Sequence, residues 1–260
     1  MEVKLDGRVA LITGGSKGIG LAIAVRMAAS GADVAILARR ADALEDARQV
    51  IAATATGRVH VVPCDVSHAN EVAGAYDEVL RVFERVDILV NNAGTSQVGT
   101  FTSITDAVWQ ADLDLKLFAA NRLARLVWPQ MAERRWGRII NVLNTVAKAP
   151  KAGSAPTSVS RAAGMALTKV LAGEGAPHNI LVNSLHVGLI ESDQWVQKHA
   201  RQKGDAPYED FLAGMAADIP LGRVGTAEEF ANVACFLASD LASYVTGASI
   251  NVDGNLCPVM

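Results

Sequence analysis

The sequence has few cysteines, few aromatic residues and no long uncharged apolar run, and these shortages exclude several classes of protein. Its three cysteines among 260 residues are widely spaced and form no C-x-x-C motif, which argues against a disulfide framework and a zinc site. No apolar run reaches the length of a membrane span, and the first residues lack the features of a secretory signal. We therefore expect a protein of the reducing cytoplasm without a bound metal.

The chain also lacks a strong charge of either sign. It carries 24 Lys and Arg residues against 27 Asp and Glu residues, and the basic residues are dispersed. This pattern indicates no surface for nucleic acid or for an anionic membrane. We expect the partners to be a small-molecule substrate and further copies of this chain.

Short β-branched segments alternate with alanine-rich segments along the whole chain. The predicted strands are apolar on both faces, as expected for a parallel sheet that helices cover on both sides. They are 8–13, 33–38, 58–63, 87–91, 138–143, 179–186 and 249–252, and helices are predicted near 18–30, 42–53, 68–84, 105–133, 154–176 and 226–238. The alternation predicts an α/β fold over residues 1–260: one doubly wound domain of Rossmann type with a seven-stranded parallel sheet.

The segment between Gly188 and Gly222 is too long for an ordinary connection in a compact domain. It contains Trp195, Phe211 and Met215. Long segments of this kind are usually lids or binding loops, so we expect residues 189–222 to close over an apolar substrate.

A glycine-rich turn follows the first predicted strand and opens the first predicted helix. Its residues are Thr13, Gly14, Gly15, Ser16, Lys17, Gly18, Ile19 and Gly20. Glycines let a pyrophosphate approach the backbone, and the free N–H groups of the helix N-terminus can hold it. Its position between a strand and a helix predicts a dinucleotide site.

The end of the second predicted strand indicates which dinucleotide is preferred. It has the sequence Ala38-Arg39-Arg40, without the acid that binds the ribose diol of NAD. The guanidinium of Arg39 suits a 2′-phosphate, and Lys17 can add a second positive charge. We expect a preference for NADP(H); the alternative is that these are solvated surface cations.

Further motifs resemble those of the short-chain dehydrogenase/reductase superfamily, in order, along nearly the whole chain. They are T-G-x-x-x-G-x-G at 13–20, Cys64-Asp65-Val66, Asn91-Asn92-Ala93-Gly94, and the segments 187–192, 236–239, 244–247 and 250–254. The resemblance implies an oxidoreductase that pairs its subunits through the helices near 105–133 and 154–176. It also implies that NADP(H) is held by Gly14, Ser16, Lys17, Gly18, Ile19, Gly20, Arg39, Arg40, Asp65, Val66, Asn92, Ala93, Gly94, Arg161, Gly188, Ile190 and Ser192.

The family's activity rests on a Ser, a Tyr-x-x-x-Lys pair and an Asn, and none of the four is found at the matching positions. The resemblance places Thr157 at the Tyr position, Arg161 at the Lys position, Asn144 at the Ser position and Asp114 at the Asn position. The three tyrosines are followed four residues later by Leu80, Leu212 and Ala248, so the sequence contains no Y-x-x-x-K.

These replacements predict that cofactor binding is retained better than proton transfer. The hydroxyl of Thr157 is a far weaker acid than a phenol. Arg161 can hold ribose hydroxyls, but a guanidinium does not release its proton. Asn144 can contact a carbonyl oxygen, and Asp114 can accept a proton or pair with Arg161.

Three other side chains have two interpretations each. His186, at the end of the sixth predicted strand, is either a replacement acid or a hydrogen-bonded strand-end histidine. Lys148 and Lys151 either meet an anionic substrate or are solvated.

The sequence leaves three functions open. The first is an NADP(H)-dependent oxidoreductase with a rebuilt proton path, acting on an apolar carbonyl or another unsaturated compound. The second is a non-catalytic NADP(H)-binding sensor or regulatory protein, and the third is a non-redox enzyme with a structural cofactor. The intact cofactor motifs and the predicted lid favour the first.

The predicted long helices also indicate self-association. They carry more apolar side chains than one sheet face can cover, namely Trp109, Leu113, Leu117, Phe118, Leu123 and Leu167. We expect a homodimer or a homotetramer.

Overall fold

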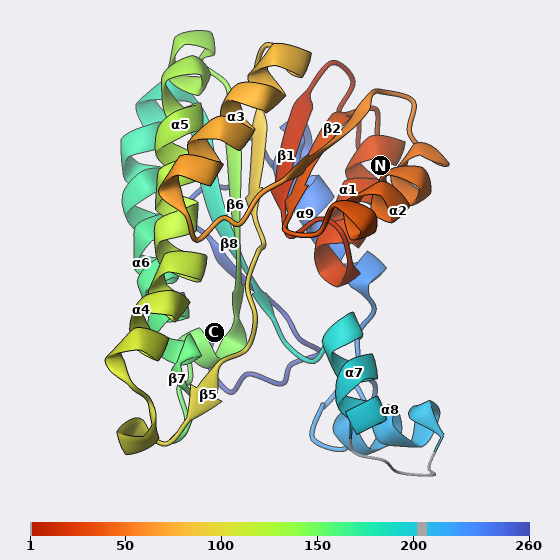
Figure 1. Cartoon of the computed structure of the whole chain (residues 1–260), viewed down its shortest axis with the longest axis vertical. Coiled ribbons are helices and arrows are strands. Elements are labelled where there is room, and N and C mark those ends of the chain that lie inside the picture. Colours follow the sequence, from red (N-terminus) through yellow and green to blue (C-terminus); the bar gives the residue numbers. More distant parts are fainter. Residues whose placement is uncertain (1, 202–206) are drawn as a thin grey trace.

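A parallel sheet with the strand order β3-β2-β1-β4-β6-β8-β9 forms the centre of the molecule (Figure 1). The computed structural model describes residues 2–201 and 207–260. The strands are β1 (Val9–Thr13), β2 (Asp33–Ala38), β3 (Val59–Pro63), β4 (Ile88–Asn91), β6 (Gly137–Asn144), β8 (Ile180–Val187) and β9 (Ser249–Val252). All neighbouring strands pair in parallel, which confirms the predicted fold class.

Helices cover both faces of this sheet (Figure 1). On one face lie α1 (Gly18–Ala29), α2 (Ala41–Ala52) and α9 (Ala227–Ala238), and on the other lie α3 (Ala69–Phe83), α5 (Ala119–Arg134) and α6 (Thr157–Gly175). Ala10 and Ile12 of β1 are buried in the first core, whereas Val9 and Leu11 are buried in the second. Burial on both faces explains why the strands are apolar throughout.

The strand order reverses between β1 and β4. The chain runs outward from β1 to β3 and then returns to place β4 on the other side of β1. In doubly wound sheets a crevice opens at this reversal, beyond the carboxyl ends of the strands, and ligands bind there. The residues that follow β1 and β4 are therefore candidates for a ligand-binding site.

The helix predicted near 105–133 is interrupted. It consists of α4 (Asp106–Leu113), a π-helical turn (Asp114–Phe118) and α5. The wider turn changes which side chains face inward, so that Lys116 is buried. Turns of this type often occur at functional sites.

Two short elements escaped prediction because they are too short to show a periodicity. β5 (Val98–Gly99) and β7 (Ala155–Pro156) pair antiparallel and hold the start of α6 against the chain after β4. Single 3-10 turns complete the fold at Phe101–Ser103, Thr145–Ala147, Ala176–His178 and Asp240–Ala242.

The segment expected to be an irregular lid contains two helices, α7 (Asp193–Arg201) and α8 (Tyr208–Ala216). The rings of His199 and Tyr208 lie 5.4 Å apart, and Phe211 lies 5.4 Å from His199. Both helices lie at the carboxyl end of the sheet (Figure 1). That residues 189–222 form a lid stays a prediction. Among residues 2–201 and 207–260, every helix is too short or too polar to cross a membrane.

A buried carboxylate ties the amino ends of the central strands together. Asp87 is 1% exposed and accepts a hydrogen bond of 3.0 Å from the backbone N–H of Val9. It also forms ion pairs with Arg85 at 3.1 Å and Arg134 at 3.2 Å. Its negative charge is therefore compensated from two sides.

We expect Asp87→Ala to lower the free energy of unfolding by about 3 kcal/mol, because the variant leaves two guanidinium groups without their counter-charge and the buried N–H group of Val9 without its acceptor. Urea denaturation of the variant and the wild type measures this difference. Glu45→Ala, which removes an exposed carboxylate from a surface pair with Arg48, is the control and should change stability little. Equal effects of the two substitutions would contradict the structural role of Asp87.

Candidate active site

The ends of β1 and β4 are joined by the side chains of Thr13 and Asn92. The Thr13 hydroxyl accepts hydrogen bonds from the backbone N–H groups of Asn92 at 2.9 Å and Ala93 at 3.0 Å. The Asn92 amide donates in return to the carbonyl oxygen of Thr13 at 2.9 Å. The glycine-rich turn and the segment 91–94, predicted separately, thus lie side by side.

The turn between β1 and α1 requires its glycines. Gly14 and Gly18 have φ angles of +66° and +54°, a region that favours glycine. A Cβ atom on Gly20 would lie 2.2 Å from the Gly14 carbonyl oxygen, so a side chain there would force the turn apart. Among the described residues, no side-chain cap is found at the start of α1, so its first N–H groups can bind an anion.

The segment after β8 approaches the same turn. A Cβ atom on Gly18 would lie 3.8 Å from the Cβ atom of Ser192. Gly188 packs so closely on Asp253 that a Cβ atom there would lie 2.4 Å from the Asp253 Cβ atom. Ile190 between them is buried. The predicted cofactor residues of this segment are therefore brought to the crevice.

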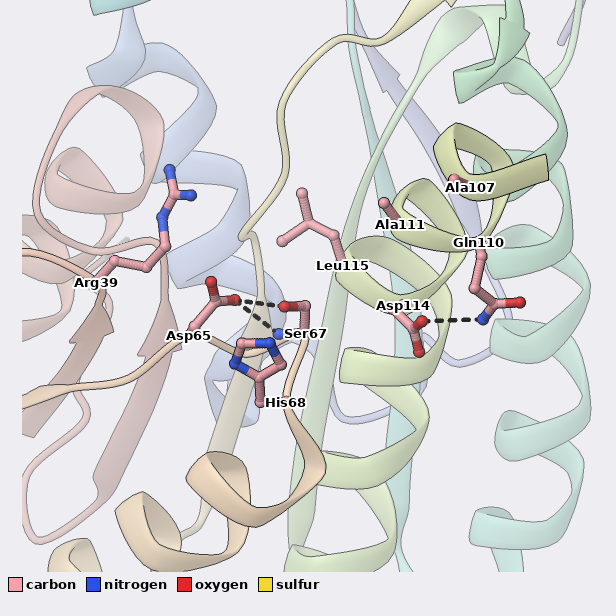
Figure 2. A pocket seen from close by; sticks show the side chains of 9 residues that line it. All are labelled: Arg39, Asp65, Ser67, His68, Ala107, Gln110, Ala111, Asp114 and Leu115. Carbon is pink, nitrogen blue, oxygen red and sulfur yellow. Dashed lines mark hydrogen bonds between the residues drawn. The ribbon is translucent and has the colours of Figure 1, made fainter. Parts of the chain in front are cut away.

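An open pocket of about 530 Å³ lies where the adenosine end of a dinucleotide is expected (Figure 2). Its lining consists of Arg39, Asp65, Ser67, His68, Ala107, Gln110, Ala111, Asp114 and Leu115. Asp65 accepts hydrogen bonds from the Ser67 hydroxyl at 2.7 Å and the Ser67 N–H at 3.0 Å. Burial alone would raise the pKa of Asp65, but these bonds and the positive charges of His68 and Arg39 together lower it. Asp65 is thus ionised, and its carboxylate can accept hydrogen bonds from a ligand in the pocket.

The two arginines after β2 differ in their surroundings. Arg39 lines the pocket and is exposed. Arg40 instead donates from Nε to Asp42 at 3.1 Å, and this contact lowers the pKa of Asp42 to about 2. Arg39 is therefore better placed for a phosphate than Arg40, whose role in cofactor binding stays a prediction.

Thr157, the first residue of α6, has every hydrogen-bonding position of its hydroxyl occupied. The hydroxyl donates to the carbonyl oxygen of Gln97 at 2.7 Å and accepts from the Gln97 N–H at 3.0 Å. It also accepts from the ammonium group of Lys116 at 2.7 Å. A threonine hydroxyl has one hydrogen and two lone pairs, so a substrate oxygen must compete with the Gln97 carbonyl for the hydrogen.

Lys116 is a functional candidate that the sequence interpretation missed. Its side chain is 1% exposed and forms an ion pair with the buried carboxylate of Asp112. Burial lowers the pKa of Lys116 to about 8, the Asp112 carboxylate opposes this change, and the positive charge of Arg161 adds to it. The only signal in the sequence was the i, i+4 spacing of Asp112 and Lys116 on one predicted helix.

Arg161 lies one helical turn after Thr157 and faces the same interior space. Its guanidinium donates to the carbonyl oxygen of Val142 at 2.9 Å. A Cβ atom on Gly94 would lie 2.3 Å from its terminal nitrogen, so the glycine after β4 provides the space for Arg161. Burial lowers its pKa to about 10, which still leaves it a cation at neutral pH.

The structure distinguishes the two interpretations of His186. Its Nδ1 atom donates to the backbone carbonyl of Asn144 at 2.9 Å, and its Nε2 atom accepts from Ser249 at 2.6 Å. Burial lowers the pKa of this fully buried ring, which keeps it neutral. His186 is therefore a hydrogen-bonded strand-end histidine that fixes the backbone of Asn144. The side-chain oxygen of Asn144 is buried and has no hydrogen-bond partner among the described residues.

Asp114 does not pair with Arg161, and that expectation is wrong. The π-helical turn places Asp114 in the lining of the adenosine pocket, where its carboxylate accepts a hydrogen bond from Gln110 at 2.9 Å (Figure 2). It accepts another from Arg122 at 3.0 Å. These hydrogen bonds lower its pKa. The interior position that was expected for Asp114 is occupied by Lys116.

The remaining candidates lie apart from this cluster. The ammonium of Lys148 donates to the carbonyl oxygen of Ser249 at 2.8 Å, and Lys151 is exposed. In the part of the chain that the structure describes, no three His, Cys, Asp or Glu side chains are grouped as metal ligands.

A doubly wound sheet with this turn, pocket and interior cluster defines a dinucleotide-binding protein. A family model described as enoyl-(acyl carrier protein) reductase matches residues 14–256. A 3-oxoacyl-[acyl-carrier-protein] reductase of Aquifex aeolicus is 34% identical over 258 residues, which cover 98% of this chain and 100% of the relative. The chain belongs to the short-chain dehydrogenase/reductase family, whose members are oxidoreductases.

Solved structures agree over the whole length. The L-sorbose reductase of Gluconobacter frateurii, complexed with NADPH and L-sorbose, has a TM-score of 0.95 and 35% identity, with 100% of both chains covered. An NADPH-bound short-chain oxidoreductase of Pseudomonas aeruginosa, described as containing an atypical catalytic center, has a TM-score of 0.91 and 35% identity, with 99% of both chains covered.

The buried position of Lys116 predicts a pH-dependent contribution to stability. Its pKa is lower in the folded state than in the unfolded state, so the unfolded chain takes up the proton first as the pH falls from about 10.5 to about 8. We expect the wild type to lose on the order of 3 kcal/mol of unfolding free energy over this interval, relative to Lys116→Met. Urea denaturation at several pH values measures it. Parallel stability curves for the two proteins would contradict the lowered pKa.

Proposed function

We propose that this protein is an NADP(H)-dependent reductase of an apolar carbonyl or another unsaturated small molecule, with a proton path built from Lys116 and Thr157. The observation that carries the proposal is the hydrogen bond of 2.7 Å from the Lys116 ammonium to the Thr157 hydroxyl. It places a titratable proton beside the residue that begins α6. Asn144, Thr157 and Arg161 belong to the proposed catalytic site, and Lys116 takes the place that was expected for Asp114.

The residues of the crevice fit NADP(H). The uncapped start of α1 suits the pyrophosphate, and Arg39 suits the 2′-phosphate because no acid stands at the end of β2. Asp65 can accept from the adenine amino group, and Ser192 lies near the turn on the nicotinamide side. The NADPH bound to the Gluconobacter frateurii and Pseudomonas aeruginosa relatives supports the same cofactor here.

When bound, NADPH supplies the hydride, and the protein must supply a proton to the substrate oxygen. A rotation about the Cβ–Oγ bond of Thr157 can turn its hydrogen from the Gln97 carbonyl to that oxygen. As Thr157 gives up this hydrogen, Lys116 passes a proton to the Thr157 oxygen, which it already contacts. A lysine with a pKa of about 8 is a suitable acid near neutral pH, whereas threonine alone is not.

Arg161 and Asn144, the other members of the cluster, can bind the cofactor and polarise the substrate carbonyl. Arg161 keeps its charge and can hold ribose hydroxyls while it stabilises negative charge on the substrate oxygen. Asn144 offers an amide to the carbonyl, on a backbone that His186 fixes. The partly buried aromatic rings of α7 and α8 favour an apolar substrate.

One observation favours a second function, that of an NADP(H)-binding sensor. Both Lys116 and Thr157 are buried, and the Thr157 hydroxyl is saturated by protein partners. A protein locked in this arrangement would bind NADPH without turnover. Stopped-flow NADPH oxidation against a panel of ketones, imines and enones separates the two functions, since a sensor oxidises none of them.

We expect Arg39→Ala to weaken NADPH binding roughly tenfold to a hundredfold and NADH binding much less, because only NADPH carries the 2′-phosphate. Calorimetry with both cofactors measures this. Arg48→Ala, on the exposed face of α2 and paired with Glu45, serves as the control and should change neither affinity. Equal affinities of the wild type for NADPH and NADH would disprove the preference.

We expect Lys116→Met to lower the turnover of ketones by roughly a hundredfold or more, with NADPH affinity retained, because the proton source is lost and the crevice is not. Steady-state NADPH oxidation and calorimetry measure the two effects. Lys4→Met, which removes an exposed lysine that pairs with Glu2, is the matched control. Full ketone turnover by Lys116→Met would rule out this proton path.

We also propose that the chain forms a homodimer or a homotetramer through α5 and α6. Leu123 is buried in the core and so cannot contribute to a surface between subunits. Phe118, which directly precedes α5, and Val159 and Val170 of α6 are exposed. Light scattering at micromolar concentration should give at least a dimer, and Val170→Asp should shift it toward the monomer. A monomeric wild type would refute the proposal.

A further inference from the structure

A second buried charge lies directly behind the proposed proton path. Asp112 is on α4, four residues before Lys116, and its side chain is 2% exposed. One of its carboxylate oxygens accepts a hydrogen bond from the Lys116 ammonium. The other, Oδ2, is buried without a hydrogen-bond partner among the described residues. Among the described residues, Lys116 is thus the hydrogen-bond partner that offsets the cost of burying this carboxylate.

The groups that face the Lys116 ammonium have opposing effects. From α6, Thr157 accepts a hydrogen bond, and the cation of Arg161 repels a second positive charge. From the loop after β4, Gly94 lies beside the aliphatic part of the lysine, since a Cβ atom there would be 3.6 Å from Lys116 Cγ. From α4, the carboxylate of Asp112 attracts the ammonium. Among these neighbours, Asp112 alone brings a negative charge.

We propose that Asp112 is the positioning residue that keeps Lys116 protonated and directs its ammonium group at Thr157. This inference rests on the proposed function, in which Lys116 supplies the proton. It assigns to Asp112 a role in setting the pH range of the reaction, although Asp112 touches neither substrate nor cofactor.

The role follows from the proton balance of one turnover. The hydride that bound NADPH would supply, with its own oxidation to NADP⁺, would form the new C–H bond while the electrons of the carbonyl π bond move to the oxygen. The resulting alkoxide would take the Thr157 hydrogen, and the Thr157 oxygen would take a proton from Lys116. Lys116 is then a neutral amine beside a carboxylate and a guanidinium. The carboxylate favours the return of a proton from water to the amine, and the guanidinium opposes it. Without Asp112, burial and the charge of Arg161 lower the pKa of Lys116 unopposed, so the amine regains its proton less readily.

The protonation of Lys116 can be measured without turnover. In protein labelled with 13C at the lysine Cε positions, Lys116→Arg identifies the Lys116 signal among the eight lysines. We expect Asp112→Asn to lower the midpoint of its titration by roughly 1–3 pH units, the usual effect of losing a nearby opposite charge. Asp112→Glu, which keeps the charge, should restore most of the midpoint, and Asp106→Asn, at the exposed start of the same helix, should leave it unchanged.

A second measurement uses the wild type, in case Asp112→Asn does not fold. The 13Cγ signal of Asp112 should move at the same pH at which Lys116 loses its proton, because the two groups share one ion pair. A Lys116 midpoint that is unchanged in Asp112→Asn, or an Asp112 signal that is flat through the Lys116 titration, would overturn the inference.

The pH dependence of ketone reduction separates this inference from the proposed function. If both hold, the pH at which the rate falls moves down in Asp112→Asn together with the Lys116 titration. If the titration moves and the rate profile does not, Asp112 still controls Lys116, but Lys116 is not the proton source. The experiment therefore tests the role of Asp112 and the role of Lys116 as the proton source separately.

Discussion

The hydrogen bond from the buried ammonium of Lys116 to Thr157 is the interaction on which the arrangement of the site depends. It requires the π-helical turn, which brings Lys116 inward from the α4 side. It also requires β5 and β7, whose pairing presents Gln97 to the remaining positions of the Thr157 hydroxyl. A buried ammonium is costly unless it is paired, and Asp112 provides the pair. Three separate segments of the chain are thus fixed around one proton.

Cofactor binding and proton transfer depend on different parts of the molecule. The proposed cofactor site consists of the crevice at the reversal of strand order, the start of α1 and the pocket with Arg39 and Asp65. The proposed proton path joins the π-helical turn to α6, and neither Lys116 nor Thr157 lines that pocket. With this separation, the proposed change of the proton donor leaves the proposed dinucleotide site intact.

The layers of the fold could be predicted because the local patterns agree with it. Strands buried on both faces, a glycine turn between strand and helix, and a missing acid at Ala38 are all readable in order along the chain. The proton path could not be predicted, because it depends on a π-helical turn that shifts the facing of Asp114 and Lys116. In the continuous helix that the sequence predicts, Asp114 was expected near Arg161, whereas the structure has Lys116 there. Two of the three hydrogen bonds that saturate the Thr157 hydroxyl are made with Gln97, which directly precedes the two-residue strand β5, and so short a strand leaves no periodic signal.

In the proposed mechanism, the proton for reduction comes from Lys116 by way of Thr157. Single-turnover oxidation of bound NADPH by a ketone, followed by stopped flow from pH 6 to pH 10, tests it most directly. With Lys116 as the source, the rate of the hydride step is constant at low pH and falls as the lysine loses its proton, with a midpoint near its pKa of about 8. A rate that stays constant up to pH 10 would contradict the account.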